Sequence, residues 1–355
     1  MSNQKNGVTI RDIAGMCGVS ISTVSNVLNG KLNKVSAEVA QKVLDAVSET
    51  GYKPNVLARN LRSASSKSIG VIVEDLFQFT TPYIIEGLTK CCEENGYTLL
   101  YENMRLFGRW DSEWMHNSSL FEQSLNEVCE KMEALNVDGV IYIGSHEHKI
   151  TLPESFGEIP TVIAYAASVD DTIPSYNLND IKGGYDVCKY LLSKGHTKIG
   201  IVAGEFDNIH TINRLQGFQK AMYEIGLPFN PDMIVFRNWI REEGYSGMKE
   251  LLQKNADITA VFAMSDLISV GVYDCLVEEG YTIGEDISVI GYDNQNFASY
   301  MLPQLTTVGM PLEDIGYKSA ERLINMLRDT NDEADGMITR LDCNIIERDS
   351  VKRIV

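Results

Sequence analysis

From residue 68 onward, short apolar runs rich in β-branched residues alternate with longer segments whose apolar positions recur every three to four residues. The short runs are typical of buried strands, and the longer segments are typical of helices. Their alternation predicts an α/β fold in which helices cover both faces of parallel sheets. The predicted strands are Ile69–Val73, Thr98–Tyr101, Gly139–Ile143, Thr161–Tyr165, Lys198–Val202, Ala260–Ala263 and Ser288–Gly291. The predicted helices are Ile84–Asn95, Leu120–Leu135, Ile181–Lys194, Arg214–Ile225, Gly244–Leu252 and Leu267–Glu279.

The predicted strands fall into two sets, so we expect two similar lobes. Ligands of open parallel sheets bind beyond the carboxyl ends of the strands. The cleft between the lobes is therefore the predicted ligand site.

Residues 8–50 predict three short helices with clear start positions. Thr9, Ser20 and Ser36 each stand where a side-chain oxygen can cap a helix. Between the first two helices, Gly18 supplies the residue able to take positive φ in a tight turn. A small three-helix bundle is one interpretation, and a helix-turn-helix is the other.

The second of these helices has an outward face suited to reading DNA. We expect it to bury Val24, Val27 and Leu28. The outward positions are Ile21, Ser22, Ser25, Asn26 and Asn29. Because this face is short-chained, uncharged and rich in hydrogen-bonding groups, it suits base edges in a major groove.

The next segment, Lys53–Arg62, is too short to form a stable helix alone. We expect DNA to order it. Arg59 and Arg62 could contact phosphates, and Leu57 or Leu61 could wedge into a base step from the minor groove.

Charge and composition support this division. Residues 1–63 carry eight Lys or Arg and four Asp or Glu, a balance of +4, whereas the remainder carries −22. Only the N-terminal end is thus expected to meet a polyanion. The 355 residues predict two or three domains at roughly 100–200 residues each. With no apolar run of membrane-spanning length and no secretory leader, we expect a cytoplasmic protein without a membrane partner.

Catalytic and metal motifs are not supported by the sequence. The seven cysteines form no C-x-x-C pair, and no Gly-rich phosphate loop or G-x-S-x-G elbow is present. His146 and His148 are interpreted as exposed loop histidines rather than a metal pair. We expect no enzymatic activity and no cofactor.

Several motifs in fixed order resemble the headpiece of the LacI/GalR family of bacterial transcriptional regulators. They are Val8–Ala14, Gly18–Ser20, Thr23–Asn29 and Tyr52–Asn55, followed by Ala58 and Leu61. The resemblance implies that Ser20–Asn29 is the recognition helix and that Leu61 kinks the operator. It implies DNA contacts by Thr9, Ser20, Ile21, Ser22, Thr23, Ser25, Asn26, Asn29, Asn55, Ala58, Arg59 and Leu61. Asn26 stands where the family often has Arg, and Asn prefers adenine over guanine.

Motifs in the body extend the resemblance to nearly the whole chain. They are Asn179-Asp180, Gly183-Gly184, Leu191–Ile199, Arg214–Phe218, Ala263–Asp266, Asp286–Asp293 and Leu305–Val308. The family's core has two lobes joined by crossover strands, like a periplasmic sugar-binding protein, and holds a small effector between them. The implied effector residues are Phe79, Tyr165, Arg214, Trp239, Ser265 and Asp293.

The chemistry of three of these positions fits a polyol. Arg214 can donate two parallel hydrogen bonds to adjacent hydroxyls, and Asp293 can accept two from the other side. Trp239 matches the family position of an aromatic platform. The alternatives are a core aromatic for Trp239 and an interlobe salt bridge for Arg214 and Asp293.

Departures from the family pattern concern the ligand and one insertion. Ser265 stands where Asn is common, Asn294 stands where a second Asp is common, and Tyr165 stands where several relatives place a charged residue. The segment Met104–Asn117 makes the link after the second strand longer than expected. We interpret it as a surface excursion, with a lid or a partner surface as alternatives.

The resemblance therefore implies a repressor. Its expected parts are a headpiece at 1–51, a hinge helix and linker at 52–67, and a two-lobed effector and dimerisation core at 68–355. We expect a homodimer on a near-palindromic operator, controlled by a sugar or sugar derivative. A purine corepressor and a DNA-independent sugar sensor are the alternatives.

Overall fold

The computed structural model describes residues 8–28, 30, 32–52, 66–111, 113–255, 257–330 and 337–354. The chain divides into two compact units, Met1–Lys67 and Ser68–Val355. In the described segments, no helix combines the length and apolar character that crossing a membrane requires. The boundary between the expected headpiece and hinge stays a prediction, because residues 53–65 lie outside the described ranges.

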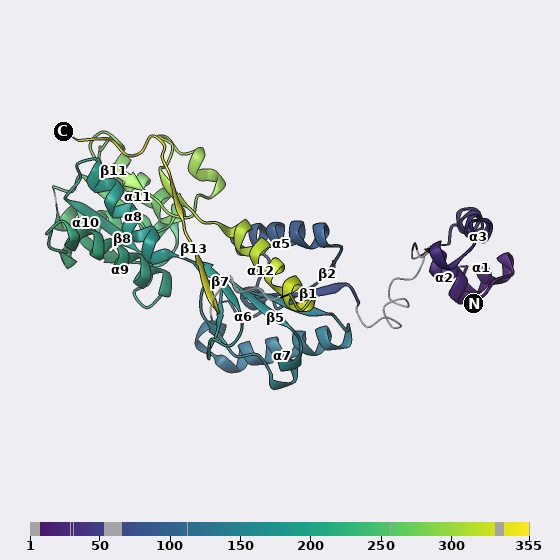
Figure 1. The fold of residues 1–355 in the computed structure, drawn as a ribbon. Coiled ribbons are helices and arrows are strands. Elements are labelled where there is room, and N and C mark those ends of the chain that lie inside the picture. Colours follow the sequence, from purple (N-terminus) through teal and green to yellow (C-terminus); the bar gives the residue numbers. More distant parts are fainter. Residues whose placement is uncertain are drawn as a thin grey trace, which may run out of the picture. The chain divides into compact units, whose positions relative to one another are not determined.

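The first unit contains the three predicted helices (Figure 1). They are α1 (Ile10–Cys17), α2 (Ile21–Leu28) and α3 (Ala37–Thr50), with the short turn η1 (Leu32–Lys34) before α3. The predicted caps form: the hydroxyls of Thr9, Ser20 and Ser36 accept backbone N–H bonds at 3.1–3.4 Å. Gly18 takes φ 67° in the turn after α1. Ile13, Val24 and Val43, all fully buried, hold the helices together.

The second unit contains two lobes. Lobe 1 is built on a six-stranded sheet in the order β13-β7-β5-β3-β1-β2, and its strand pairs are parallel. These strands are β1 (Ser68–Val73), β2 (Thr98–Asn103), β3 (Gly139–Ile143), β5 (Thr161–Ala164), β7 (Ser175–Leu178) and β13 (Ile338–Leu341). Helices α5 (Thr81–Asn95) and α12 (Leu312–Leu327) cover one face, and α7 (Ser118–Ala134) covers the other (Figure 1). Side-chain alternation explains this, since Val71 packs in the α5 and α12 cluster and Ile72 in the α7 cluster.

Lobe 2 is built on a four-stranded parallel sheet in the order β11-β10-β8-β9. Its strands are β8 (Ile199–Ala203), β9 (Ile234–Phe236), β10 (Ala260–Ala263) and β11 (Ser288–Ile290). Its helices are α8 (Asp180–Ser193), α9 (Ile209–Glu224), α10 (Arg241–Lys254) and α11 (Asp266–Glu278). Gly184 lets the backbones of α8 and α9 approach, because a Cβ there would lie 2.0 Å from the Arg214 carbonyl oxygen.

The chain crosses between the lobes three times. It enters lobe 2 between β7 and α8, returns between β12 (Thr307–Gly309) and α12, and leaves lobe 1 again between β13 and β14 (Asn344–Ile346). β12 and β14 pair antiparallel. The remaining elements are α6 (Leu106–Trp110), η2 (Glu113–His116), β4 (Lys149–Ile150), η3 (Glu154–Glu158), β6 (Ala167–Ser168), η4 (Pro231–Met233) and η5 (Asn296–Ser299).

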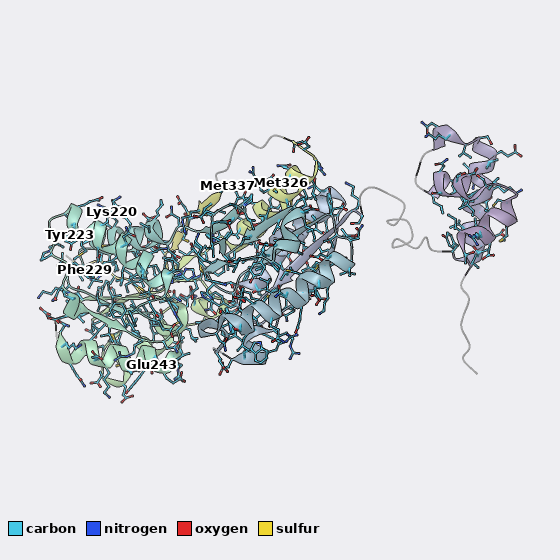
Figure 2. The ribbon with its side chains drawn as sticks, turned by 90° about the horizontal axis from the view of Figure 1, so that it is seen from below. Lys220, Tyr223, Phe229, Glu243, Met326 and Met337 are labelled. Atoms are coloured by element: carbon cyan, nitrogen blue, oxygen red, sulfur yellow. The ribbon has the colours of Figure 1, made fainter. Side chains whose placement is uncertain are left out.

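The α/β prediction and the seven predicted strands are confirmed, but the structure holds elements that the pattern missed. Among them are α12 and the strands β7, β9 and β13. α9 begins at Ile209, five residues before its predicted start. Surface side chains surround the core; the labelled Met326, near the end of α12, and Met337, just before β13, are 38% and 41% exposed (Figure 2).

The prediction that Met104–Asn117 is a surface excursion holds only in part: Arg105, Arg109, Asp111, Glu113 and Met115 are exposed, but three apolar side chains are buried. Met104 and Leu106 are fully buried, and Trp114 is only 4% exposed. The Trp114 ring packs edge-on against Phe107 at 5.5 Å and stacks near Phe121 of α7 at 6.0 Å. Met104, Leu106 and Trp114 therefore anchor the segment in the lobe 1 core, because they extend the cluster beneath α7.

Candidate functional site

Arg214 forms the centre of a buried network in lobe 2. It lies on α9 and is 2% exposed. Its Nε donates to Asp180 Oδ1 at 2.8 Å, and its Nη1 donates to the Met264 carbonyl oxygen at 2.6 Å. The guanidinium lies 3.6 Å from the Tyr292 ring centre and 5.9 Å from that of Trp239. Burial opposes the charged form, yet the Asp180 carboxylate, together with Tyr292 and Asp293, outweighs burial and raises the pKa of Arg214.

Asp180, the first residue of α8, is the anion of this network and is 1% exposed. Its second oxygen accepts a hydrogen bond from His210 Nδ1 at 2.6 Å. Burial alone would raise its pKa, but the Arg214 and His210 partners hold the pKa of Asp180 well below its usual range. Asp180 is thus a fixed negative charge between two side chains of α9.

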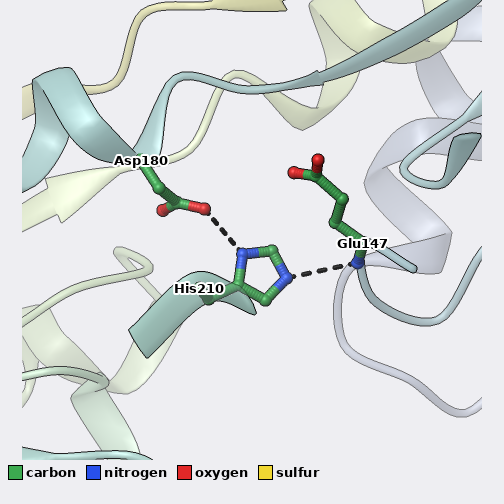
Figure 3. Close-up of side chains that lie close together, drawn as sticks. All are labelled: Glu147, Asp180 and His210. Carbon is green, nitrogen blue, oxygen red and sulfur yellow. Dashed lines mark hydrogen bonds and ion pairs between the residues drawn. The ribbon is translucent and has the colours of Figure 1, made fainter. Parts of the chain in front are cut away.

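His210 joins the network to lobe 1. Its Nε2 accepts a hydrogen bond from the Glu147 backbone N–H at 3.2 Å and lies 3.3 Å from the Tyr165 hydroxyl (Figure 3). The Tyr165 ring stacks on the imidazole at 5.5 Å between centres. The Glu147 carboxylate in turn accepts two hydrogen bonds, at 2.9 and 2.5 Å, from Arg340 of β13. Side chains from both lobes therefore meet at His210.

These groups also form the one cluster of potential metal ligands found in the described segments. One ligand atom each from Glu147, Asp180 and His210 lies within 4.8 Å of the others. Both carboxylates are already paired with a guanidinium, from Arg340 and Arg214 respectively. A divalent ion would have to displace these bonds, so the donor set does not fit a metal site.

Asp293 lies on the lobe 2 side of the cleft, directly after β11. It is partly buried and adopts φ 115°, a backbone conformation that L-residues rarely take. The neighbouring Asp266 is fully buried and accepts hydrogen bonds from Thr307 Oγ1 at 2.5 Å and Gln295 N at 2.6 Å. Burial raises the pKa of Asp266 to about 7. Burial and the Asp266 charge raise the pKa of Asp293 as well.

A pocket of about 280 Å³ lies beside Asp293 and is lined by residues of both lobes. Phe79 and Tyr83 line it from lobe 1, and Asp293 and Gln295 line it from lobe 2. The crossover residues from Met310 to Asp314 close it. A second hollow of about 640 Å³ lies within lobe 1, around residues 150–161 and 168–174, and contains none of the expected ligand residues.

The six expected effector residues thus occupy neighbouring but distinct positions. Tyr165 and Trp239 contact the His210 and Arg214 groups, whereas Phe79 and Asp293 line the pocket. Asp293 connects the two sets along the chain, because it directly follows Tyr292, whose ring lies 3.6 Å from the Arg214 guanidinium. The remaining residue, Ser265, caps α11 by accepting a bond from Ile268 N at 3.0 Å.

The partners that hold these side chains were not predicted from the sequence. Asp180 was named only within a family motif, and Glu147 and His210 were not named. His210 precedes Arg214 by four residues on one helix, and this spacing could have indicated a shared face.

The interpretation of His146 and His148 as exposed is wrong, since both are partly buried. His148 Nε2 lies 2.9 Å from an oxygen of Glu74, which is fully buried and also accepts from the Tyr142 hydroxyl and Ser145 N. Burial would raise the pKa of Glu74, but the charge and hydrogen bond of His148, together with His146 and Ser145, outweigh it and lower this pKa to about 2. Because Glu74 follows β1, whereas Ser145 and His148 follow β3, the cluster anchors the loop that carries Glu147.

In the first unit, the expected DNA-reading face is largely as predicted. Val24 and Val27 are buried; Ser20 and Ser22 are exposed, while Thr23, Ser25 and Asn26 are partly exposed. Ile21 departs from the expectation, because it packs against the core of the unit instead of pointing freely outward. Thr9 is exposed and caps α1. Five further expected contacts lie outside the described residues: Asn29, Asn55, Ala58, Arg59 and Leu61.

Two family models match the chain. Residues 9–55 match bacterial regulatory proteins of the lacI family, and residues 188–351 match a periplasmic binding protein-like domain. An HTH-type transcriptional repressor named PurR, from Histophilus somni (strain 129Pt), is 32% identical over 351 residues, which are 98% of this chain and 99% of that relative.

Solved structures give the same picture of the fold. A lac repressor dimer bound to operator and the anti-inducer ONPF matches with a TM-score of 0.80 at 23% identity, covering 98% of this chain and 100% of that one. The complex of the transcriptional regulator CelR with cellobiose matches with a TM-score of 0.64 at 23% identity, covering 97% of this chain and 99% of that one.

Proposed function

Because this chain belongs to the lacI family and is a DNA-binding transcriptional repressor, we propose that a small, neutral, polar effector bound between its two lobes controls its affinity for an operator. The family consists of transcriptional regulators and not of enzymes. The observation that carries the proposal is the buried Arg214 network, which lies beside Asp293 and contacts lobe 1 through His210. A repressor acts on chromosomal DNA, so the proposal includes cytoplasmic localisation.

A sugar or sugar derivative is the effector class that we propose. Two of the five N–H donors of Arg214 bond to Asp180 and Met264, and the others are available to hydroxyl groups. Asp293 supplies acceptors from the pocket. Trp239, near the Arg214 guanidinium, offers an aromatic face to the C–H surface of a ring. Each hydrogen bond to a charged group contributes about 1.5–3 kcal/mol.

A thermal-shift screen tests the ligand class. A sugar present at 100 times its Kd stabilises the core by about 2.7 kcal/mol, which raises its Tm by several degrees. We expect Arg214→Lys to abolish most of that shift, because Lys cannot donate two parallel bonds. The matched control is Arg237→Lys, since Arg237 lies in lobe 2 and pairs with Glu250 at the surface. If no sugar in a broad panel shifts the Tm of the wild type, the sugar proposal is wrong.

A purine base acting as corepressor is the second candidate. The relatives named PurR favour it, because they match this chain over nearly its full length. A flat base could stack on the same aromatic face and hydrogen-bond to Arg214 and Asp293. The same screen separates the candidates: a shift with hypoxanthine or guanine but with no sugar would select the purine.

Operator binding by a homodimer completes the proposal. We expect duplex DNA to be shifted in a salt-dependent manner, and deletion of residues 1–62 to abolish the shift while leaving ligand binding intact. Thr9, Ser20, Ser22, Thr23, Ser25 and Asn26 are the proposed contacts among the described residues. Asn26→Ala should weaken binding most at sites with adenine opposite that position. A chain that binds its ligand but no duplex would instead be a DNA-independent sensor.

A further inference from the structure

We propose that His210 is the positioning residue that couples effector occupancy at Arg214 to the arrangement of the two lobes. The inference rests on the proposed function. It assigns a role to a side chain that lies between the effector residues and lobe 1, and that the ligand itself need not touch.

The hydrogen bonds fix the state of the imidazole ring. The Glu147 backbone N–H donates to Nε2, so this nitrogen carries no proton. The proton must then reside on Nδ1, which donates to Asp180 at 2.6 Å. The ring is a neutral connector with one acceptor facing lobe 1 and one donor facing lobe 2.

The contacts of His210 connect different parts of the second unit. Glu147 belongs to the loop after β3 in lobe 1, whereas Asp180 begins α8 where the chain enters lobe 2. His210 and Arg214 lie four residues apart on α9. The connected series therefore runs from Arg340 on β13 through Glu147, His210 and Asp180 to Arg214. Figure 3 shows its three central residues, Glu147, His210 and Asp180.

The charges along this series explain why it can respond to a ligand. The guanidinium groups of Arg340 and Arg214 stand at its two ends, and each is paired with a carboxylate. A ligand that takes hydrogen bonds from the remaining N–H groups of Arg214 acts on the same guanidinium that positions Asp180, and Asp180 is the acceptor that orients His210. The Glu147 N–H bond crosses between lobes, and Glu147 is only 7% exposed. Separating the lobes would leave this N–H without its acceptor. Ligand occupancy at Arg214 and the arrangement of the lobes are therefore thermodynamically coupled.

Two substitutions separate the two ring nitrogens. In His210→Asn, the amide nitrogen occupies the Nδ1 position, so the donor to Asp180 is kept and the acceptor for Glu147 is lost. In His210→Gln, the longer side chain brings its carbonyl oxygen to the Nε2 position, so the acceptor is kept and the donor is lost. A merely structural role would make both variants equivalent.

Hydrogen–deuterium exchange at the Glu147 amide in the full-length protein is the first measurement, because it requires no ligand. We expect His210→Asn to accelerate exchange of this amide at least five-fold, the factor that corresponds to one net neutral hydrogen bond. We expect His210→Gln to retain most of the protection. Unchanged exchange in His210→Asn would overturn the proposal.

Operator affinity with and without ligand is the second measurement, with ribose, cellobiose, hypoxanthine and guanine as probes. We expect the affinity of His210→Asn for the active probe to lie within about two-fold of the wild-type value. The factor by which the probe changes operator affinity should be at least five-fold smaller in His210→Asn than in the wild type. A full ligand response in His210→Asn, despite faster exchange of the Glu147 amide, would make His210 a structural residue and refute its coupling role.

Failure of the proposed function gives a different pattern. If none of the probes stabilises the wild-type core, the assigned ligand classes are wrong. The operator affinity of ligand-free protein then decides the role of His210: a change of five-fold or more in His210→Asn, absent in His210→Gln, supports coupling. Equal affinities for operator in the two variants and the wild type would contradict it.

Discussion

The Asp180 carboxylate offers the sharpest test of the energetics of the buried network. It is 1% exposed and accepts hydrogen bonds from both Arg214 Nε and His210 Nδ1. Asp180→Asn preserves the shape of the side chain but removes its charge. The Arg214 guanidinium would then be buried with neutral close partners only: the amide oxygen of the substituted side chain, the Met264 carbonyl oxygen and the Tyr292 ring, among the groups described above.

Removing one partner of a buried ion pair costs about 3–5 kcal/mol, because the other charge is left without compensation. In a domain of this size, 1 kcal/mol corresponds to roughly 2–4 °C in Tm. We therefore expect Asp180→Asn to lower the Tm of the core by about 6–20 °C at neutral pH. The Tm of each variant is measured by differential scanning calorimetry.

The sign of the pH dependence follows from the lowered pKa of Asp180. A carboxyl group whose folded pKa lies below its unfolded value stabilises the protein above the unfolded pKa near 4, and that stabilisation is lost as the pH falls. The difference between wild type and Asp180→Asn should thus be full at pH 7 and shrink in acid.

Asp186→Asn is the matched control, since Asp186 lies on the same helix and pairs with Lys182 four residues away at the surface. Its cost should be below about 1 kcal/mol. A loss in Asp180→Asn no larger than in this control would refute the reasoning that Asp180 neutralises a buried cation.

Three further predictions concern lobe 1 and the packing of α8 on α9. Although burial opposes its charged form, the Glu74 carboxylate raises the pKa of His148, so its stabilising effect should be full below about pH 6.5 and fade as the pH rises through the folded value. Denaturation of His148→Asn should therefore show a greater loss at about pH 6 than at about pH 9. Trp114→Ala should cost about 3–5 kcal/mol in urea unfolding, because it empties a core position. Gly184→Ala should cost about 1–3 kcal/mol or more, because its Cβ would meet the Arg214 carbonyl oxygen.

Each of these predictions has a control or a contradicting outcome. If the loss of unfolding free energy in His148→Asn does not depend on pH, the ion pair between Glu74 and His148 contributes no net charge interaction. Trp110→Ala should cost less than Trp114→Ala, since Trp110 is only partly buried. Gly157→Ala should be nearly neutral, because a Cβ there would contact nothing within 4 Å. Equal costs for Gly184→Ala and Gly157→Ala would argue against close packing of the α8 and α9 backbones.

Features that depend on neighbours in the chain could be predicted from the sequence. The cap of α1 needs only Thr9 and Asp12, three residues apart, and the turn after it needs only Gly18. The strand Ile69–Val73 was predicted within one residue, because a continuous run of buried apolar side chains has no competing interpretation. The motif around Arg214 also identified a residue that the structure places in the buried network.

Short or polar strands could not be predicted from the pattern of apolar residues. β7 (Ser175–Leu178) contains Tyr176 and Asn177, and β13 (Ile338–Leu341) contains Arg340. Neither is long or apolar enough to indicate a strand by itself. β13 becomes a strand because it pairs in parallel with β7, more than 150 residues earlier in the chain.

The amino-acid sequence by itself determined the helical first unit, the alternation of strands and helices, and the residue types expected to contact DNA and ligand. Only the tertiary structure decided that Asp180 neutralises Arg214, that Glu147 meets His210, and that Trp114 lies in a core. Local patterns report burial and periodicity, whereas pairing between distant groups depends on how three crossovers bring the lobes together. A charge on the chain therefore acquires its partner, and its energetic effect, only after folding.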